Sequence, residues 1–110
     1  MNFKTGRADH IEDYLITVRE GQWFGWSDSK NKVYAKLVVH DGGAKPSEAD
    51  VNAGLKKLQD DFDAKDYSRK RVTAYPLIQD QLDMQYWDKK NGTTTWVDAI
   101  AKVKSDNPKP

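Results

Sequence analysis

The two histidines come closest to a pattern that could carry acid–base or metal chemistry. Each lies beside an aspartate, in the pairs Asp9-His10 and His40-Asp41. A metal ion needs further ligands, and general acid–base catalysis needs a reacting group within hydrogen-bond distance. The sequence provides neither at a recognisable spacing, so we expect surface or helix-capping histidines without a metal ion.

Three other segments contain groups that bind ligands in other proteins. The acidic residues 60–63 lack the spaced loop and the glycine of a calcium hand. Residues 42–47 lack the spacing of a phosphate loop, and Pro46 removes a backbone donor. The basic residues 65–71 could grip a single nucleic-acid strand, but 18 basic against 17 acidic residues give the chain no concentrated positive field. The chain also has no cysteine, so we expect no enzyme, no cofactor and no nucleic-acid partner.

The stretch GQWFGWS brings three large aromatic side chains together. Trp23, Phe24 and Trp26 could form a platform that stacks on a glycan or a peptide. Only 37% of the residues are hydrophobic, so a core also needs these side chains. We expect a core role, with Gly25 allowing another element to approach closely, and a binding platform is the alternative.

The first half of the chain is typical of a helix followed by a β-hairpin. Asp9 is a good N-cap for apolar residues at helical spacing, which predicts a short helix over residues 10–20. Residues 15–18 are rich in β-branched side chains and would also suit a strand. Residues 23–26 and 33–39 flank a polar cluster of turn formers and predict the two strands of the hairpin.

A long amphipathic helix is expected next. Residues 47–50, Ser-Glu-Ala-Asp, match a capping box with Asp in the last position. Apolar residues then recur at intervals of four and three, which predicts a helix to at least Ala64. The stripe consists of Val51, Leu55, Leu58 and Phe62. The helix can continue toward Tyr75, where Pro76 ends it.

The last segment predicts a helical hairpin. Apolar residues spaced four apart follow Pro76, Asn91-Gly92 is a turn signal, and a capping pattern begins at Thr95. So short a hairpin buries too little to stand alone, so it needs the preceding domain or another subunit. We therefore expect an α+β fold with a small domain, residues 1–72, and a C-terminal helical hairpin module, residues 73–110. The candidate interface residues are Tyr75, Ile78, Leu82, Tyr86, Trp87, Trp96, Ile100 and Val103.

Residues 75–110, YPLIQDQLDMQYWDKKNGTTTWVDAIAKVKSDNPKP, resemble a C-terminal module of small tail-associated virion proteins of tailed bacteriophages. The shared features are a Tyr-Pro pair, a Gln-Leu-Asp core, an aromatic helix end, a Trp-x-x-x-Ile helix and a Pro-Lys finish. They fall on Tyr75, Pro76, Gln81, Leu82, Asp83, Trp96 and Ile100. Residues 23–59 are similar to the region that precedes this module in some of these proteins. The family offers no catalytic residues, so the resemblance implies a role without a catalytic site.

The role implied by the resemblance is that of a non-enzymatic component of a phage tail, neck or fibre attachment. Such a protein is made in the host cytoplasm and located in the virion, its partners are other virion proteins, and we expect a homo-oligomer. The alternatives are a tail or tail-fibre assembly chaperone and a glycan- or peptide-binding module. No run approaches the ~20 apolar residues of a membrane span, so no membrane contact is expected.

Overall fold

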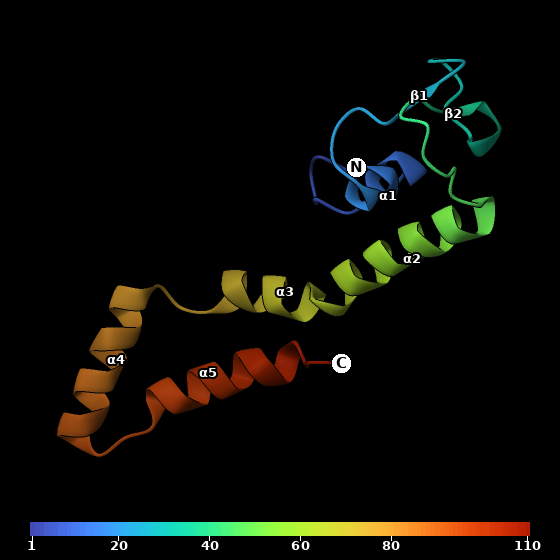
Figure 1. The fold of residues 1–110 in the computed structure, drawn as a ribbon. Coiled ribbons are helices and arrows are strands. Elements are labelled where there is room, and N and C mark those ends of the chain that lie inside the picture. Colours follow the sequence, from blue (N-terminus) through green and yellow to red (C-terminus); the bar gives the residue numbers. More distant parts are fainter. The chain divides into compact units, whose positions relative to one another are not determined.

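The computed structural model describes residues 1–110 and has an α+β fold that is mostly helical (Figure 1). The elements are α1 (Ile11–Val18), β1 (Phe24–Trp26), the 3-10 helix η1 (Tyr34–Lys36), β2 (Leu37–Val39), α2 (Glu48–Ala64), α3 (Asp66–Ala74), α4 (Ile78–Asn91) and α5 (Thr95–Asp106). The predicted class and the predicted order of helix, hairpin, long helix and helical hairpin are confirmed. The chain forms two compact units, Met1–Asp63 and Ala64–Pro110, which we describe separately.

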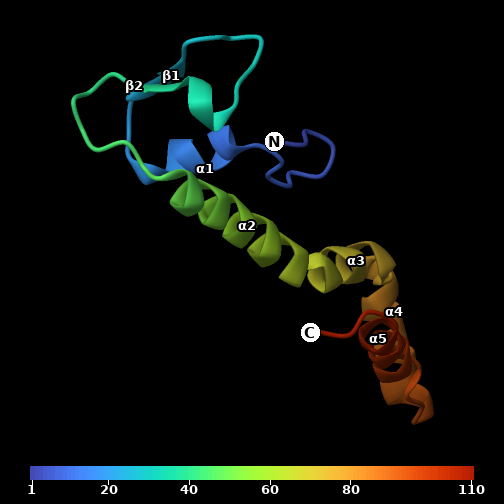
Figure 2. The same cartoon turned by 90° about the vertical axis from the view of Figure 1, so that its right-hand side faces the viewer.

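The core of the first unit is small and draws on every element of that unit. Figure 2 shows α1 between the strand pair and the first turns of α2. Four side chains are at most 4% exposed and form the centre of this core. They are Leu15, Trp23, Leu37 and Val51. A single large indole thus supplies much of the apolar surface that the unit buries.

The cap of α1 differs from the one that the sequence suggested. His10 is the N-cap, and its Nδ1 accepts a hydrogen bond from the backbone N–H of Glu12 at 3.0 Å. The carboxylate of Asp13 accepts a hydrogen bond from the backbone N–H of His10 at 3.2 Å. The prediction that Asp9 caps the helix was therefore wrong, because a histidine and an aspartate form the capping box instead. The alternative strand over residues 15–18 is replaced by the helix, which places Leu15 in the core.

The hairpin is shorter than predicted. β1 and β2 pair antiparallel over three residues each, whereas the sequence predicted a strand over residues 33–39. In the observed register, residues 33–36 lie opposite residues 27–30, which are turn formers and provide no strand for pairing. The chain forms η1 there, and the Tyr34 hydroxyl donates a hydrogen bond to the Pro46 carbonyl oxygen at 2.6 Å.

The long helix begins at its predicted cap and is interrupted once. The backbone N–H of Asp50 donates a hydrogen bond to Ser47 Oγ at 3.1 Å. Lys65, with φ −98° and ψ 5°, separates α2 from α3, and α3 ends at Ala74 before the predicted stop at Pro76. The predicted boundary between residues 72 and 73 lies inside α3, which the contacts place in the same unit as α4 and α5.

Gly54 allows the aromatic ring of Tyr14 on α1 to lie against α2. A Cβ atom at Gly54 would overlap this ring. We expect Gly54→Ala to lower the free energy of unfolding by about 1–3 kcal/mol through overpacking, although alanine favours the helix. Urea unfolding followed by circular dichroism measures this change. Asn52→Ala, at an exposed position of α2, is the control and should not destabilise the protein. A Gly54→Ala protein as stable as the wild type would contradict the close contact.

Candidate protein interface

A single carboxylate joins α4 to α5. Asp88 Oδ1 accepts hydrogen bonds from Thr95 Oγ1 at 2.6 Å, Thr93 Oγ1 at 2.7 Å and the Thr95 backbone N–H at 3.1 Å. Its Oδ2 accepts a hydrogen bond from the Trp96 backbone N–H at 2.8 Å. The side chain is 9% exposed. Asp88 thus accepts hydrogen bonds from N–H groups in the first turn of α5, which have no acceptor within the helix.

The same hydrogen bonds change the acidity of Asp88. Those from Thr95, Thr93 and the Trp96 backbone N–H stabilise the ionised form and lower the pKa of this carboxyl to about 2. The turn itself is formed by Gly92, whose φ of 67° lies in the left-handed region that favours glycine. The Thr93 backbone N–H then donates to the Asp88 carbonyl oxygen at 3.0 Å. The predicted Asn91-Gly92 turn is thus stabilised by the left-handed conformation of Gly92 and by this hydrogen bond.

Gln81 makes a second link across the hairpin. Its Oε1 accepts a hydrogen bond from Trp96 Nε1 at 3.1 Å, and its Nε2 donates to the Pro76 carbonyl oxygen at 2.8 Å. Trp96 is half-buried at the contact between the helices. One amide therefore fixes the orientation of the indole and the start of α4.

α3 closes the other end of the unit. Arg71 Nε donates a hydrogen bond to the Asn107 carbonyl oxygen at 2.9 Å, and its guanidinium lies 4.9 Å from the centre of the Tyr67 ring. The arginine thus donates a hydrogen bond to a carbonyl group at the C-terminal end of α5. Nearby on α5, Val103 is the one buried apolar side chain of this unit.

Seven large apolar side chains of the second unit are exposed. They are Val72, Leu77, Ile78, Leu82, Tyr86, Trp87 and Val97. Ile78, Leu82 and Tyr86 are 67%, 58% and 59% exposed, and their spacing of four residues places them along one ridge of α4. We call these three residues the α4 ridge.

The eight predicted interface residues fall into two groups. Ile78, Leu82, Tyr86 and Trp87 are exposed. Tyr75, Trp96 and Ile100 are half-buried and Val103 is buried. The first group thus lies at the surface of α4, while the second group is partly or fully covered within the unit.

Two of the predicted interface residues, Trp96 and Ile100, lie at the surface of α5. A shallow hollow of about 300 Å³ runs along this helix. It is lined by Trp96, Val97, Ile100, Ala101 and Lys104. Their spacing along a helical face was visible in the sequence, but Val97 and Ala101 looked unremarkable beside the tryptophan.

The aromatic hairpin lies in the first unit and is partly core. Trp23 is 2% exposed, and the guanidinium of Arg19 lies 4.0 Å from the centre of its ring. Phe24 and Trp26 are half-buried and line an open hollow of about 520 Å³ together with His40 and five other residues. Trp23 therefore offers no accessible ring to a ligand, whereas the other two aromatic residues border an open space.

The close approach expected at Gly25 is made by a side chain. A Cβ atom at Gly25 would lie 2.6 Å from Nε2 of His40. On the other side of the hairpin, the ring of His10 lies edge-on to Trp26, with 5.8 Å between the ring centres. Both histidines thus contribute to packing around β1.

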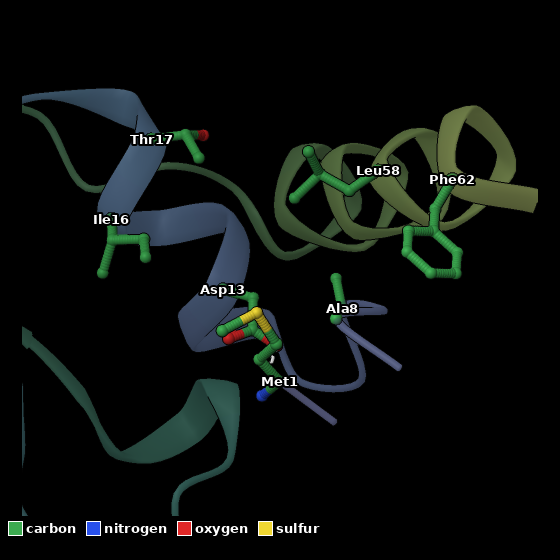
Figure 3. A pocket seen from close by; sticks show the side chains of 8 residues that line it. Met1, Ala8, Asp13, Ile16, Thr17, Leu58 and Phe62 are labelled. Carbon is green, nitrogen blue, oxygen red and sulfur yellow. Dashed lines mark ion pairs between the residues drawn. The ribbon is translucent and has the colours of Figure 1, made fainter. Parts of the chain in front are cut away.

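Figure 3 shows another hollow of the first unit, of about 290 Å³, between α1 and α2. Leu58 and Phe62 on α2 lie on one side, and Ile16 on α1 lies on the other. The amino group of Met1 forms an ion pair with Asp13 at 2.8 Å. The one carboxylate in the lining is therefore already paired.

The other candidate groups from the sequence are engaged within the chain. His10 Nε2 lies 2.8 Å from the Lys32 carbonyl oxygen, and the Arg19 guanidinium pairs with Asp41 at 2.7 Å. No group of three or more histidine, aspartate or glutamate side chains converges on a point that could hold a metal ion. None of the helices combines the length and the apolar character needed to cross a membrane.

Comparisons with models of protein families, with curated proteins and with solved structures found no match for this chain. A functional proposal therefore starts from the surfaces of the C-terminal hairpin and from the residue pattern of positions 75–110.

Asp88 predicts a specific dependence of stability on pH. Its pKa is lowered in the folded state, so its ionised form stabilises the fold above about pH 4, and this contribution is lost as the pH falls toward 2. Asp88→Asn removes the contribution at every pH. We expect the difference in melting temperature between wild type and Asp88→Asn to be largest near about pH 6 and to shrink in acid.

Glu20→Gln, which changes an exposed carboxylate of the first unit, is the control and should show no such shrinking difference. Hydrogen exchange measured by NMR gives a local readout, because Asp88→Asn should speed exchange of the Trp96 backbone N–H. Equal exchange of this group in wild type and variant would show that Asp88 does not stabilise α5.

Proposed function

We propose that this chain is a non-enzymatic component of a bacteriophage virion, in the tail, the neck or a fibre attachment, and that it joins other virion subunits through its C-terminal hairpin. The observation that carries the proposal is the small core of the second unit. Val103 is its one buried apolar side chain, while seven large apolar side chains are exposed. A unit with so little core gains stability when a partner covers such side chains.

The α4 ridge is the natural centre of such a contact. More than half of each of its three side chains is open to solvent. Covering the exposed part would contribute roughly 1 kcal/mol per side chain. A contact of this kind holds subunits together by apolar burial and needs no chemical step.

The residue pattern of the hairpin supports the phage assignment. Pro76, Gln81 and Trp96 belong to the resemblance with tail-associated virion proteins, and the two hydrogen bonds of Gln81 join all three. The side chains of Gln81 and Trp96 are thus explained by the internal structure of the hairpin. Leu82 belongs to the same pattern but is exposed, which suits a residue that contacts a partner.

The first test is whether the protein belongs to the mature particle. We expect mass spectrometry to detect it in gradient-purified particles of the phage that encodes it, at a fixed ratio to the major tail protein. An assembly chaperone would instead be present in infected cells and absent from purified particles. Absence from the particles would therefore overturn the virion assignment in favour of the chaperone.

A substitution on the α4 ridge tests the surface. Leu82→Glu places a charge where a partner should bury an apolar side chain, so we expect incorporation into particles to fall by at least about tenfold. Complementation of a phage that lacks the gene, followed by quantitative mass spectrometry, measures this.

Ile16→Glu is the matched control for this substitution. Ile16 is an apolar residue of the first unit that is 64% exposed, and we expect its variant to be incorporated normally. Circular dichroism checks that both variants keep their helix content. Normal incorporation of Leu82→Glu would show that α4 is not the contact.

A further inference from the structure

The exposed charges of α4 are separated along the helix, whereas the buried Asp88 is engaged with the start of α5. Asp80 and Asp83 lie in the first half of α4, and Lys89 and Lys90 lie in its last turns. All four are exposed, and none forms an ion pair within the chain. Acidic residues near the start of a helix and basic residues near its end suit the helix dipole. Lys90 Nζ lies 5.2 Å from the centre of the Trp87 ring on the same helix, a cation–π contact that leaves its charge without an acidic partner.

The other long helices pair their charges internally. Lysine and aspartate side chains four residues apart form ion pairs of 2.6–3.0 Å on α2, α3 and α5. These pairs are Lys56–Asp60, Lys57–Asp61, Lys70–Asp66 and Lys102–Asp106. On α4, the separation of Asp83 from Lys90 is about 10 Å along the axis, which is too far for such a pair. α4 is therefore the helix whose exposed charges form no ion pair and whose apolar ridge is open to solvent.

We infer that α4 pairs with α4 of a second copy of this chain in antiparallel orientation. In this arrangement the acidic half of each helix lies opposite the basic half of the other, so Asp83 approaches the second copy's Lys90 and the reverse contact follows by symmetry. A parallel pair would place like charges opposite each other. The inference rests on the proposed function, because it names a second copy of this chain as the partner that the hairpin surface binds.

The same arrangement buries the α4 ridge. The midpoint between the acidic and the basic residues falls at Gln85 and Tyr86, on the face that also carries Leu82. Leu82 and Tyr86 thus lie at the centre of the contact, with Ile78 toward its ends. The methylene groups of Lys89 cover the leucine of the other copy while the ammonium group stays in water.

The size of the contact predicts its strength. α4 has 14 residues and is about 21 Å long, so one helix pair covers less than the roughly 1,600 Å² of a standard stable interface. We therefore expect dissociation in the micromolar range, and weaker association at high salt because the flanking pairs are exposed to solvent.

Charge variants test the pairing. Sedimentation equilibrium of the full chain should show association of the wild type and at least about tenfold weaker association of Asp80→Lys/Asp83→Lys and of Lys89→Glu/Lys90→Glu. An equimolar mixture of the two variants should associate again, because one α4 is then basic and the other acidic. Lys4→Glu/Lys30→Glu, which changes two exposed lysines of the first unit, is the matched control and should associate like the wild type.

A monomeric wild type, unchanged association of both variants, or a mixture that stays monomeric would each overturn the inference. If the charge variants lose helix content by circular dichroism, Leu82→Ala replaces them, because alanine keeps the charges and favours the helix. Its association should also weaken.

Disulfide cross-linking tests the orientation of the two α4 helices. The chain has no cysteine, so only the introduced residue can form a disulfide. Gln85→Cys lies near the symmetry axis, so oxidation should link two copies through a disulfide. Ile78→Cys lies on the same face but about 20 Å from its counterpart in an antiparallel pair, so it should stay unlinked. Efficient linking of both variants would indicate a parallel pair and overturn the inference.

The two proposals can fail separately. A protein that is monomeric in solution yet present in purified particles would overturn the α4 pairing and leave the virion assignment standing. A protein that associates through α4 but is absent from particles would overturn the virion assignment and leave the α4 pairing standing.

Discussion

The hydrogen bonds that Asp88 accepts from the residues at the start of α5 constrain the whole C-terminal hairpin. They fix the direction in which the chain leaves the Gly92 turn, and they satisfy backbone groups that α5 cannot satisfy alone. Asp88 and Gln81 join the two helices through hydrogen bonds, and Val103 is the one buried apolar side chain of this unit. The apolar side chains of the α4 ridge are exposed to solvent, so they are available for contact with another molecule.

The two units of the chain are stabilised by different interactions. The first unit concentrates its apolar surface in Leu15, Trp23, Leu37 and Val51, around one large indole. The second unit has one buried apolar residue, and its helices are joined by hydrogen bonds that Asp88 accepts and that Gln81 and Arg71 form. Both units leave large apolar side chains exposed, but only the first also buries a cluster of them. This difference is the physical reason to place the interface in the C-terminal hairpin.

Local spacing predicted the elements well, and long-range contacts account for what it missed. The stripe from Val51 to Phe62, the cap at Ser47 and the Asn91-Gly92 turn each depend on neighbours a few residues away, so the sequence was sufficient. The strand expected over residues 33–36 was wrong because pairing depends on the opposite strand, which is only three residues long. The ridge spacing of Ile78, Leu82 and Tyr86 was equally visible, but a helical stripe can face a core or a partner. Nothing in the sequence distinguished Asp88 from the other aspartates, because its role depends on threonines that the turn brings back to it.

The geometry around Asp88 also determines where the chain tolerates insertions. The donors on Thr93, Thr95 and Trp96 reach one carboxylate only because the connection has its present length, so an added residue there would break several hydrogen bonds at once. The tip of the loop between the two strands, residues 28–31, is held differently, by short-range bonds such as that from the Lys30 backbone N–H to Asp28 Oδ1 at 3.0 Å. A peptide tag or a fluorescent label is therefore best placed in this loop, where it leaves the C-terminal hairpin and its surface intact.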